Sequence, residues 1–354
     1  MDKKIAIIAA IVIIVVAIAA ISLSQQGGNN GDDDQDDGEI YEFTDSNGYE
    51  HSVHVPISNV SVVHKYIPMF MKVLGVEDEV AGLDSTYGMS FERFFDNCFS
   101  IGSFSEPNGE IMLQHGSNII LSPITMGLSN GDSLNEMGIE VIYLDLTDPQ
   151  AIEQNLEILV NLFGATEEVV ENYNKYMDLF YECYDYVDQF DFSATADADV
   201  CLYMSSSGFY QTHESAAVKV LESVSGQSYT HIVDPNVKDT VYFNQSPTVI
   251  YNFDGEYGLD YLFLYSMDTH QENLQKFLDS GKDIDLSTMS CFENKHVYSI
   301  STDCVNGVLS CVSLILYADA FGADVGDKAT EIVQAFNDTF GLDYQTGDLI
   351  EQMA

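Results

Sequence analysis

Two histidines have positions that suggest chemistry. His64 follows the apolar segment "VSVV", and His213 follows the hydroxyl-rich segment "SSSGFYQT". Imidazole is the commonest ligand for metal ions of intermediate softness, so each histidine is a candidate for contact with a metal. If both held one bare ion, Asp303 would be the candidate third ligand. A hydrogen-bonded or solvated histidine is the alternative interpretation for each.

Motifs for covalent or phosphoryl chemistry are missing from the sequence. There is no GxSxG, no P-loop, and no GxGxxG that opens a helix. The six cysteines form no CxxC pair and no zinc-ligand spacing, so we expect mostly buried thiols and can assign no disulfide connectivity. They are Cys98, Cys183, Cys201, Cys291, Cys304 and Cys311. The sequence therefore favours a binding protein without a prosthetic group over an enzyme.

Charge excludes one class of partner. The chain has 12 Lys and Arg against 57 Asp and Glu, a net charge of −45, which would repel the phosphates of a nucleic acid. We interpret the acidity as a means of solubility in a saline or exposed setting. With 354 residues, of which 46% are hydrophobic, the chain is long enough for two cores.

The first residues predict where the protein works. The apolar run "IAIIAAIVIIVVAIAAI" is longer than the core of a signal peptide and close to the roughly 20 residues of a spanning helix. Lys3 and Lys4 precede it, so the positive-inside rule places the rest of the chain outside the membrane. We expect residues 1–23 to be an uncleaved signal anchor, with a cleaved signal peptide as the alternative. Residues 24–39, "SQQGGNNGDDDQDDGE", predict a disordered acidic linker to the membrane.

Residues 40–165 have the pattern of an α/β lobe. A hairpin is predicted around Asn47-Gly48, and "KYIPMFMKVLG" predicts a helix. Strands alternating with helices indicate a parallel sheet with right-handed crossovers. The predicted strands are 60–64, 80–84, 118–122 and 140–145.

A long helix is predicted to join this lobe to a second one. A shorter helix, with Asp148 as N-cap, comes first, and the long helix then occupies residues 166–190, with Thr166 as its N-cap. Residues 191–354 predict a C-terminal α/β lobe, with amphipathic helices near its end. Its expected strands are "ADVCLYMSS", "TVIYNF" or nearby, "YLFLYS" and "KHVYSIS". The fold class is therefore α/β with two lobes.

The serial order of these segments resembles a known family. Over roughly residues 40–345, the hairpin "TDSNGYEHSVHVP", then "SVVH", "VAGLD", "IGSFSEPNGEIMLQHGSNIIL", "MGIEVIYLD", the long helix and "HVYSIS" are similar to substrate-binding proteins of ABC importers. The family serves ferric siderophores, haem and cobalamin. The resemblance implies two Rossmann-like lobes joined by one rigid helix, with the ligand in a cleft between them. It further implies a monomeric receptor that delivers a metal chelate to a permease and its ATPase. A cell-surface enzyme or adhesion protein on the same fold is the alternative.

Ligand contacts are expected where the strands end, because sites in parallel sheets form at the carboxyl ends. Aromatic and hydroxyl side chains dominate these positions, which suits a bulky chelate with an apolar body and a polar rim. Lys65 is the one basic residue among them, so we rank hydroxamate siderophores or corrinoids above anionic catecholates, and haem lower. The cargo would then be a ferric or cobalt chelate. The candidates are His64, Lys65, Tyr66, Ser85, Thr86, Tyr87, Ser103, Phe104, Ser122, Ser207, Phe209, Tyr210, His213, Tyr242, Phe243, Tyr265 and Asp303.

The resemblance also implies a docking contact on each lobe, where a Glu would reach an Arg of the permease. Glu110 has that position in the first lobe, just before "IMLQHGSN". It would also suit the positive end of a helix dipole. In the second lobe Asn252 stands where a Glu is expected, and Asp254 or Glu256 is the substitute.

Overall fold

The computed structural model describes most of the chain after the linker. The described residues are 39–86, 94–95, 97–124, 127–212, 215–225, 242–244, 246–266 and 268–354. The predicted signal anchor, most of the linker, Tyr87 and His213 lie outside them. In the part that is described, every helix is too short or too polar to cross a bilayer.

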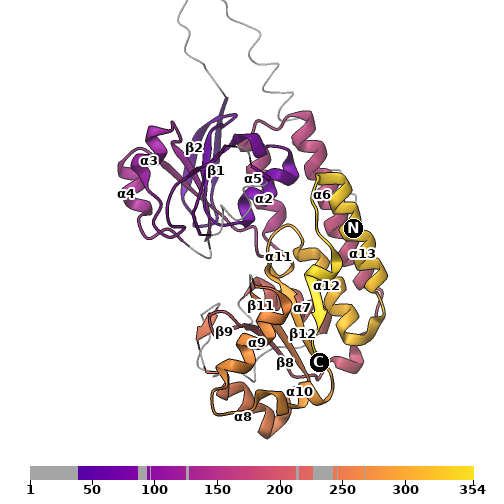
Figure 1. Ribbon diagram of the computed structural model, residues 1–354. Helices are drawn as coiled ribbons and strands as arrows, with labels where there is room; N and C mark the ends of the chain where they lie inside the picture. Colours follow the sequence, from indigo (N-terminus) through magenta and orange to yellow (C-terminus); the bar gives the residue numbers. More distant parts are fainter. Residues whose placement is uncertain are drawn as a thin grey trace, which may run out of the picture. The chain divides into compact units, whose positions relative to one another are not determined.

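The first lobe is built on a parallel sheet, as predicted (Figure 1). Its five strands lie in the order β5-β4-β3-β6-β7, and all neighbours are parallel. A separate antiparallel hairpin, β1-β2, precedes them, with the turn at Asn47-Gly48. The bounds are β1 Glu39–Thr44, β2 Glu50–Val55, β3 Val60–Val62, β4 Val80–Leu83, β5 Phe99–Ser100, β6 Ile119–Pro123 and β7 Glu140–Leu144.

The helices of this lobe are α2 (Tyr66–Leu74), α3 (Gly109–Gln114), α4 (Gly131–Glu136) and α5 (Ile152–Leu162), with a short 3-10 turn at Glu77–Glu79. Pro68 is tolerated in α2 because it lies in the first turn, where its missing N–H has no intrahelical acceptor. The prediction of Asp148 as N-cap was wrong, since α5 begins at Ile152. The Asp148 carboxylate instead accepts a bond from the Gln150 N–H at 2.9 Å and pairs with Lys219 at 2.6 Å.

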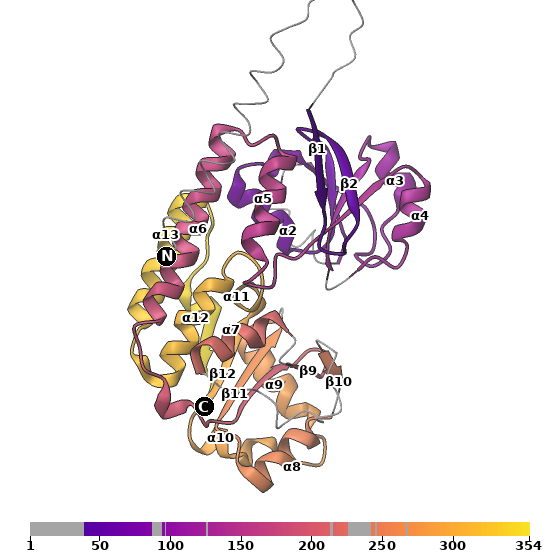
Figure 2. The same ribbon diagram turned by 180° about the vertical axis from the view of Figure 1, so that it is seen from behind.

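The long helix is α6, Glu167–Val187. Its N-cap is Thr166, whose hydroxyl accepts a bond from the Val169 N–H, as predicted. The helix ends at Val187 rather than at the predicted Phe190. At 1.5 Å per residue it is about 30 Å long, and it contains no Gly or Pro. Its buried face packs against α12 and α13 of the second lobe and against α2 and α5 of the first (Figure 2).

The second lobe has a mixed six-stranded sheet in the order β10-β9-β8-β11-β12-β13. Only β8, β11 and β12 are mutually parallel; β9, β10 and β13 pair antiparallel. Phe209 and Tyr210, which were expected at the end of a strand, lie within the antiparallel strand β9. The bounds are β8 Val200–Met204, β9 Phe209–Gln211, β10 Tyr242–Asn244, β11 Tyr261–Ser266, β12 Val297–Ser301 and β13 Ile350–Gln352.

The strand predicted at "TVIYNF" or nearby lies just upstream of that segment, at β10, and the segment itself is helical. The segment "TVIYNF" opens α8, Thr248–Tyr257, in which Ile250 and Phe253 are buried one helical turn apart. The other helices are α7 Ala216–Ser225, α9 His270–Ser280, α10 Ser290–Glu293, α11 Thr302–Val305, α12 Ser310–Ala318, α13 Gly326–Phe340 and α14 Thr346–Leu349. The short 3-10 turns are Ser193–Thr195 and Leu286–Thr288, and a π-helical segment, Asp319–Ala323, follows α12.

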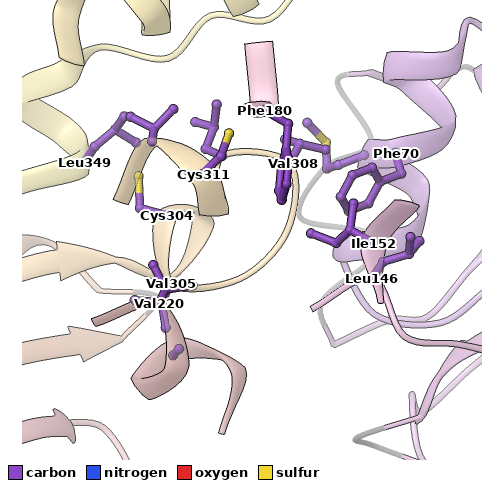
Figure 3. Close-up of a cluster of buried hydrophobic side chains, with 14 of the residues drawn as sticks. Phe70, Leu146, Ile152, Phe180, Val220, Cys304, Val305, Val308, Cys311 and Leu349 are labelled. Carbon is purple, nitrogen blue, oxygen red and sulfur yellow. The ribbon is translucent and has the colours of Figure 1, made fainter. Parts of the chain in front are cut away.

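One hydrophobic core extends through both lobes. Figure 3 shows part of it, with Phe70 and Ile152 from the first lobe, Phe180 from α6 and Val305 from the second. Each of these side chains is at most 4% exposed. Because α6 contributes to the core of both lobes, a change in the angle between them would have to repack buried side chains.

Candidate functional site

Lys65 brings together the carboxyl ends of strands from both sheets. It follows β3, and its Nζ donates to the hydroxyl of Thr302 and pairs with the carboxylate of Asp303. Thr302 and Asp303 open α11 directly after β12. Lys65 and Asp303 were both predicted from the sequence. The carboxyl ends of parallel strands are where α/β sheets bind ligands, so the contact marks the candidate site.

The charge of Lys65 is largely compensated within the protein. Its side chain is 4% exposed and that of Asp303 is 22% exposed, so water screens the pair only partly. Next to it, the ring of Tyr66 packs against the backbone of Gly307, where a Cβ would lie 3.1 Å from a ring carbon. The two lobes therefore meet here through an ion pair and an aromatic contact.

His64 is held rigidly at the end of β3. Its backbone adopts φ 68°, its N–H donates to Asp84 Oδ2 at 2.7 Å, and its ring lies 4.2 Å from that of Tyr66. Burial, and then the positive charge of Lys65, lower the pKa of His64 to about 3. The imidazole is therefore neutral at physiological pH, the form that can bind a metal.

A metal site of three or more ligands is not found among the described residues. They contain no group of three or more His, Cys, Asp and Glu arranged to hold an ion. Asp303, the candidate third ligand, pairs with Lys65. His213 lies outside the described residues, so a shared contact of His64 and His213 stays a prediction.

Asp84 organises the neighbouring strand ends and was missed as a site residue. Its buried carboxylate accepts the N–H groups of His64 and, at 2.9 Å, of Thr86. The sequence did contain a signal for this role, namely an Asp at the end of an apolar strand. A carboxylate that is buried there must accept hydrogen bonds from neighbouring groups. Ser85 then donates its hydroxyl to the Gly102 carbonyl at 2.9 Å, which joins the ends of β4 and β5.

The other predicted contacts divide by exposure. Ser85, Thr86, Ser103 and Ser207 are exposed, and Phe104 and Phe209 are half-buried. Tyr242 and Phe243 lie in the edge strand β10.

Three predicted contacts are instead core residues. Ser122, Tyr210 and Tyr265 are at most 1% exposed, so a ligand does not reach their side chains in this conformation. Tyr210 pairs across the β8-β9 hairpin with Tyr203 and donates its hydroxyl to the Ser246 carbonyl at 3.3 Å. The hydroxyl of Tyr265 is hydrogen-bonded to Gln211.

The candidate docking residues also differ from one another. Glu110 is exposed in the first turn of α3, whose N-cap is Asn108, with a bond of 3.1 Å from the Ile111 N–H. Asp254 instead accepts backbone N–H groups from Leu259 at 2.8 Å and Ser290 at 3.0 Å. Glu256 is exposed. An exposed carboxylate is therefore present in each lobe, at Glu110 and at Glu256.

A pocket of about 380 Å³ lies elsewhere in the first lobe. It is lined by residues of the hairpin, of α4 and of β7 with the turn before it. Its lining includes the acidic residues Glu50, Asp132 and Glu140. His51 lies at its wall, where one ring nitrogen faces Glu140 and the other faces Asp45 Oδ2 at 3.1 Å. The Asp45 carboxylate also accepts the Tyr143 N–H at 3.0 Å, so this cluster anchors the hairpin to β7.

The chain is similar to known proteins in structure. No family model and no curated protein matches the sequence. A solved TroA-like periplasmic binding protein, FepB from Veillonella parvula, has 15% identity and a TM-score of 0.63, over 88% of this chain and 99% of that one. Ceue from Helicobacter pylori, solved with Ni(II) bound, has 12% identity and a TM-score of 0.62, over 86% and 98%.

A third solved structure is the triscatecholate siderophore binding protein FeuA from Bacillus subtilis, complexed with ferri-bacillibactin. It has 15% identity and a TM-score of 0.61, over 80% of this chain and 98% of that one. At identities this low, the structural similarity establishes the fold alone. This fold agrees with the two α/β lobes and the helix predicted from the sequence. The chain has the two-lobed α/β fold of the TroA-like periplasmic binding proteins.

Proposed function

We propose that this chain is the extracytoplasmic substrate-binding receptor of an ABC importer and that it captures a metal chelate. The observation that carries the proposal is the contact of Lys65 with Thr302 and Asp303, which joins the carboxyl ends of strands from both sheets. In a fold shared with periplasmic binding proteins, this is where a ligand held by both lobes would lie. The predicted signal anchor and linker would keep the receptor at the outer face of the membrane.

The electrostatics of the site favour a ligand of low charge. Lys65 is neutralised by Asp303, and the strand ends of the first lobe carry exposed hydroxyl groups on Ser85, Thr86 and Ser103. The net charge of −45 would oppose an approaching polyanion. These features support a hydroxamate siderophore or a corrinoid over a ferric catecholate.

Titration of the purified chain with candidate ligands would test both the proposed function and the ranking of ligand classes. The probes are a ferric hydroxamate, cobalamin, a ferric catecholate, haem and bare Ni²⁺, followed by calorimetry. We expect tight binding of the ferric hydroxamate or the cobalamin. Tight binding of the catecholate alone would reverse the ranking, and binding of bare Ni²⁺ alone would indicate a metal-ion receptor using His64. Binding of no probe would count against the proposed function.

Removal of the Glu110 charge should separate docking from ligand capture. We expect Glu110→Ala to leave ligand affinity unchanged and to lower stimulation of the transporter ATPase several-fold, because a charge at the rim orients a complex without touching the ligand. The measurement is ATPase activity of the reconstituted transporter as the receptor is titrated. Glu136→Ala, an exposed acid at the end of the neighbouring helix α4, is the matched control. Equal ATPase curves for both variants and the native chain would exclude Glu110 from docking.

A further inference from the structure

The ion pair between Lys65 and Asp303 joins the two lobes in surroundings that exclude most water. Lys65 follows β3 of the first lobe, and Asp303 lies in the first turn of α11, directly after β12 of the second. The side chain of Lys65 is 4% exposed, whereas that of Lys72, which pairs with Glu77, is 20% exposed. Solvent and salt therefore screen the charges of the interlobe pair less than those of a pair nearer the surface.

The second lobe supplies the printed partners of the Lys65 ammonium group. Its Nζ donates to the hydroxyl of Thr302 and to the carboxylate of Asp303. The Asp303 backbone N–H donates to the Ser301 hydroxyl at 3.2 Å, which fixes the acid at the start of α11. The preceding residue, His64, adds no positive charge, because burial and then Lys65 lower its pKa to about 3. Lys65 thus carries the positive charge of this segment, and Asp303 compensates it.

We propose that Asp303 determines ligand specificity by masking the charge of Lys65 from anionic chelates. The inference rests on the proposed function, because it assigns a role to a residue of the same site. The Asp303 carboxylate occupies the position beside the ammonium group that an anionic oxygen of a ligand would need. A ligand that displaced it would leave a partly buried carboxylate unpaired beside its own negative charge. A ligand without net charge does not meet this penalty.

The exposure of the two side chains agrees with this role. Asp303 is 22% exposed and Lys65 is 4% exposed, so solvent reaches the acid more readily than the base. A ligand at the strand ends would therefore approach the acidic member of the pair. The fold itself does not exclude an anionic chelate, because FeuA was solved with ferri-bacillibactin bound. The charge preference must then come from side chains, and Asp303 is a single side chain whose charge can be removed.

Asp303→Asn is the direct test, because it removes the charge and keeps an oxygen that can accept a bond from Lys65. The probes are ferri-bacillibactin, as the anionic chelate, and ferrichrome, as a ferric hydroxamate without net charge, each titrated by calorimetry. We expect the affinity for ferri-bacillibactin to rise about tenfold or more, the range of close charge pairs, and that for ferrichrome to stay nearly unchanged. Added salt should weaken the gained affinity, whereas a purely structural effect would not respond to salt.

Further variants assign the effect to the pair. Glu136→Gln removes one charge from an exposed acid at the end of α4 and controls for the net charge of the chain, so its affinities should equal the native ones. Lys65→Met/Asp303→Asn removes both charges of the pair, a change that buried ion pairs often tolerate, and the gain should disappear. Asp303→Ser gives the same measurement if circular dichroism shows that the Asn variant does not fold. A gain that persists in the double variant, or is equal in Glu136→Gln, would refute the proposal.

The outcomes separate this inference from the proposed function. If the native chain binds ferrichrome or cobalamin and Asp303→Asn gains no affinity for ferri-bacillibactin, only this inference is wrong. If the native chain binds no chelate and Asp303→Asn binds ferri-bacillibactin, the mask is supported and the proposed ligand class is wrong. Tight binding of ferri-bacillibactin by the native chain would show that Asp303 masks nothing.

Discussion

Replacement of Tyr176 by alanine is expected to lower the free energy of unfolding by about 3–5 kcal/mol, the usual cost of removing a buried aromatic ring. Tyr176 lies on α6 and is 0% exposed. The centroid of its ring is 5.4 Å from that of Phe70 in the first lobe. On the other side, the Phe336 centroid in α13 of the second lobe is 5.9 Å away. The variant would thus leave a cavity in the part of the core that both lobes share.

Tyr176→Phe is the matched control, because it keeps the ring and removes only the hydroxyl. That hydroxyl is buried and has no hydrogen-bond partner among the described residues. Its loss should leave stability unchanged or raise it by about 1 kcal/mol, since an unsatisfied buried polar group is costly. Urea denaturation followed by circular dichroism would measure both variants. A loss below about 1 kcal/mol for Tyr176→Ala would show that α6 is not an essential part of one core.

Acid should destabilise the folded chain through His64. The folded protein holds the pKa of His64 at about 3, against an ordinary value of 6.5, because burial and Lys65 oppose its positive form. Between these two pH values the unfolded chain binds the proton and the folded chain does not. The stability that the neutral His64 contributes is therefore complete above about pH 6.5. It is lost progressively as the pH falls toward 3, by an upper bound of roughly 5 kcal/mol.

The carboxylates of this acidic chain also titrate in that range, so the prediction concerns a difference between two proteins. His64→Asn removes the titrating ring and suits the positive φ of this position. Lys65, Tyr66 and Asp84 each interact with His64, and all three remain in the variant. We expect unfolding free energies measured from pH 7 to pH 4 to fall more steeply in the native chain than in His64→Asn. Parallel curves would contradict the assigned pKa.

The first lobe could be predicted well because buried parallel strands are short, continuous apolar runs. Segments such as Ile119–Pro123 and Glu140–Leu144 are bounded by turns and could hardly be mistaken for helices. In the second lobe, "TVIYNF" has the same β-branched composition but forms the start of α8. Packing of Ile250 and Phe253 on one helical face decided that segment, and composition did not reveal it.

The site was predictable in place and less so in detail. The sheet rule located Lys65 and Asp303 separately, but their ion pair joins residues 238 positions apart, which one sequence cannot reveal. The pattern of residues along a strand also does not indicate which face of the strand points into the core. Ser85 and Thr86 are exposed, whereas Tyr210 and Tyr265 are buried by pairing and packing across the sheet.

The unbroken helix α6 has a consequence for how a transporter would use such a receptor. A helix without Gly or Pro, packed into the core of both lobes, leaves little freedom for the lobes to close around a ligand. In the proposed function, the occupied and the empty receptor would then offer nearly the same surface to the permease. The empty receptor would act as a competitive inhibitor of the occupied one. Uptake would depend on the fraction of receptors that carry cargo, so that an excess of receptor over ligand would slow import.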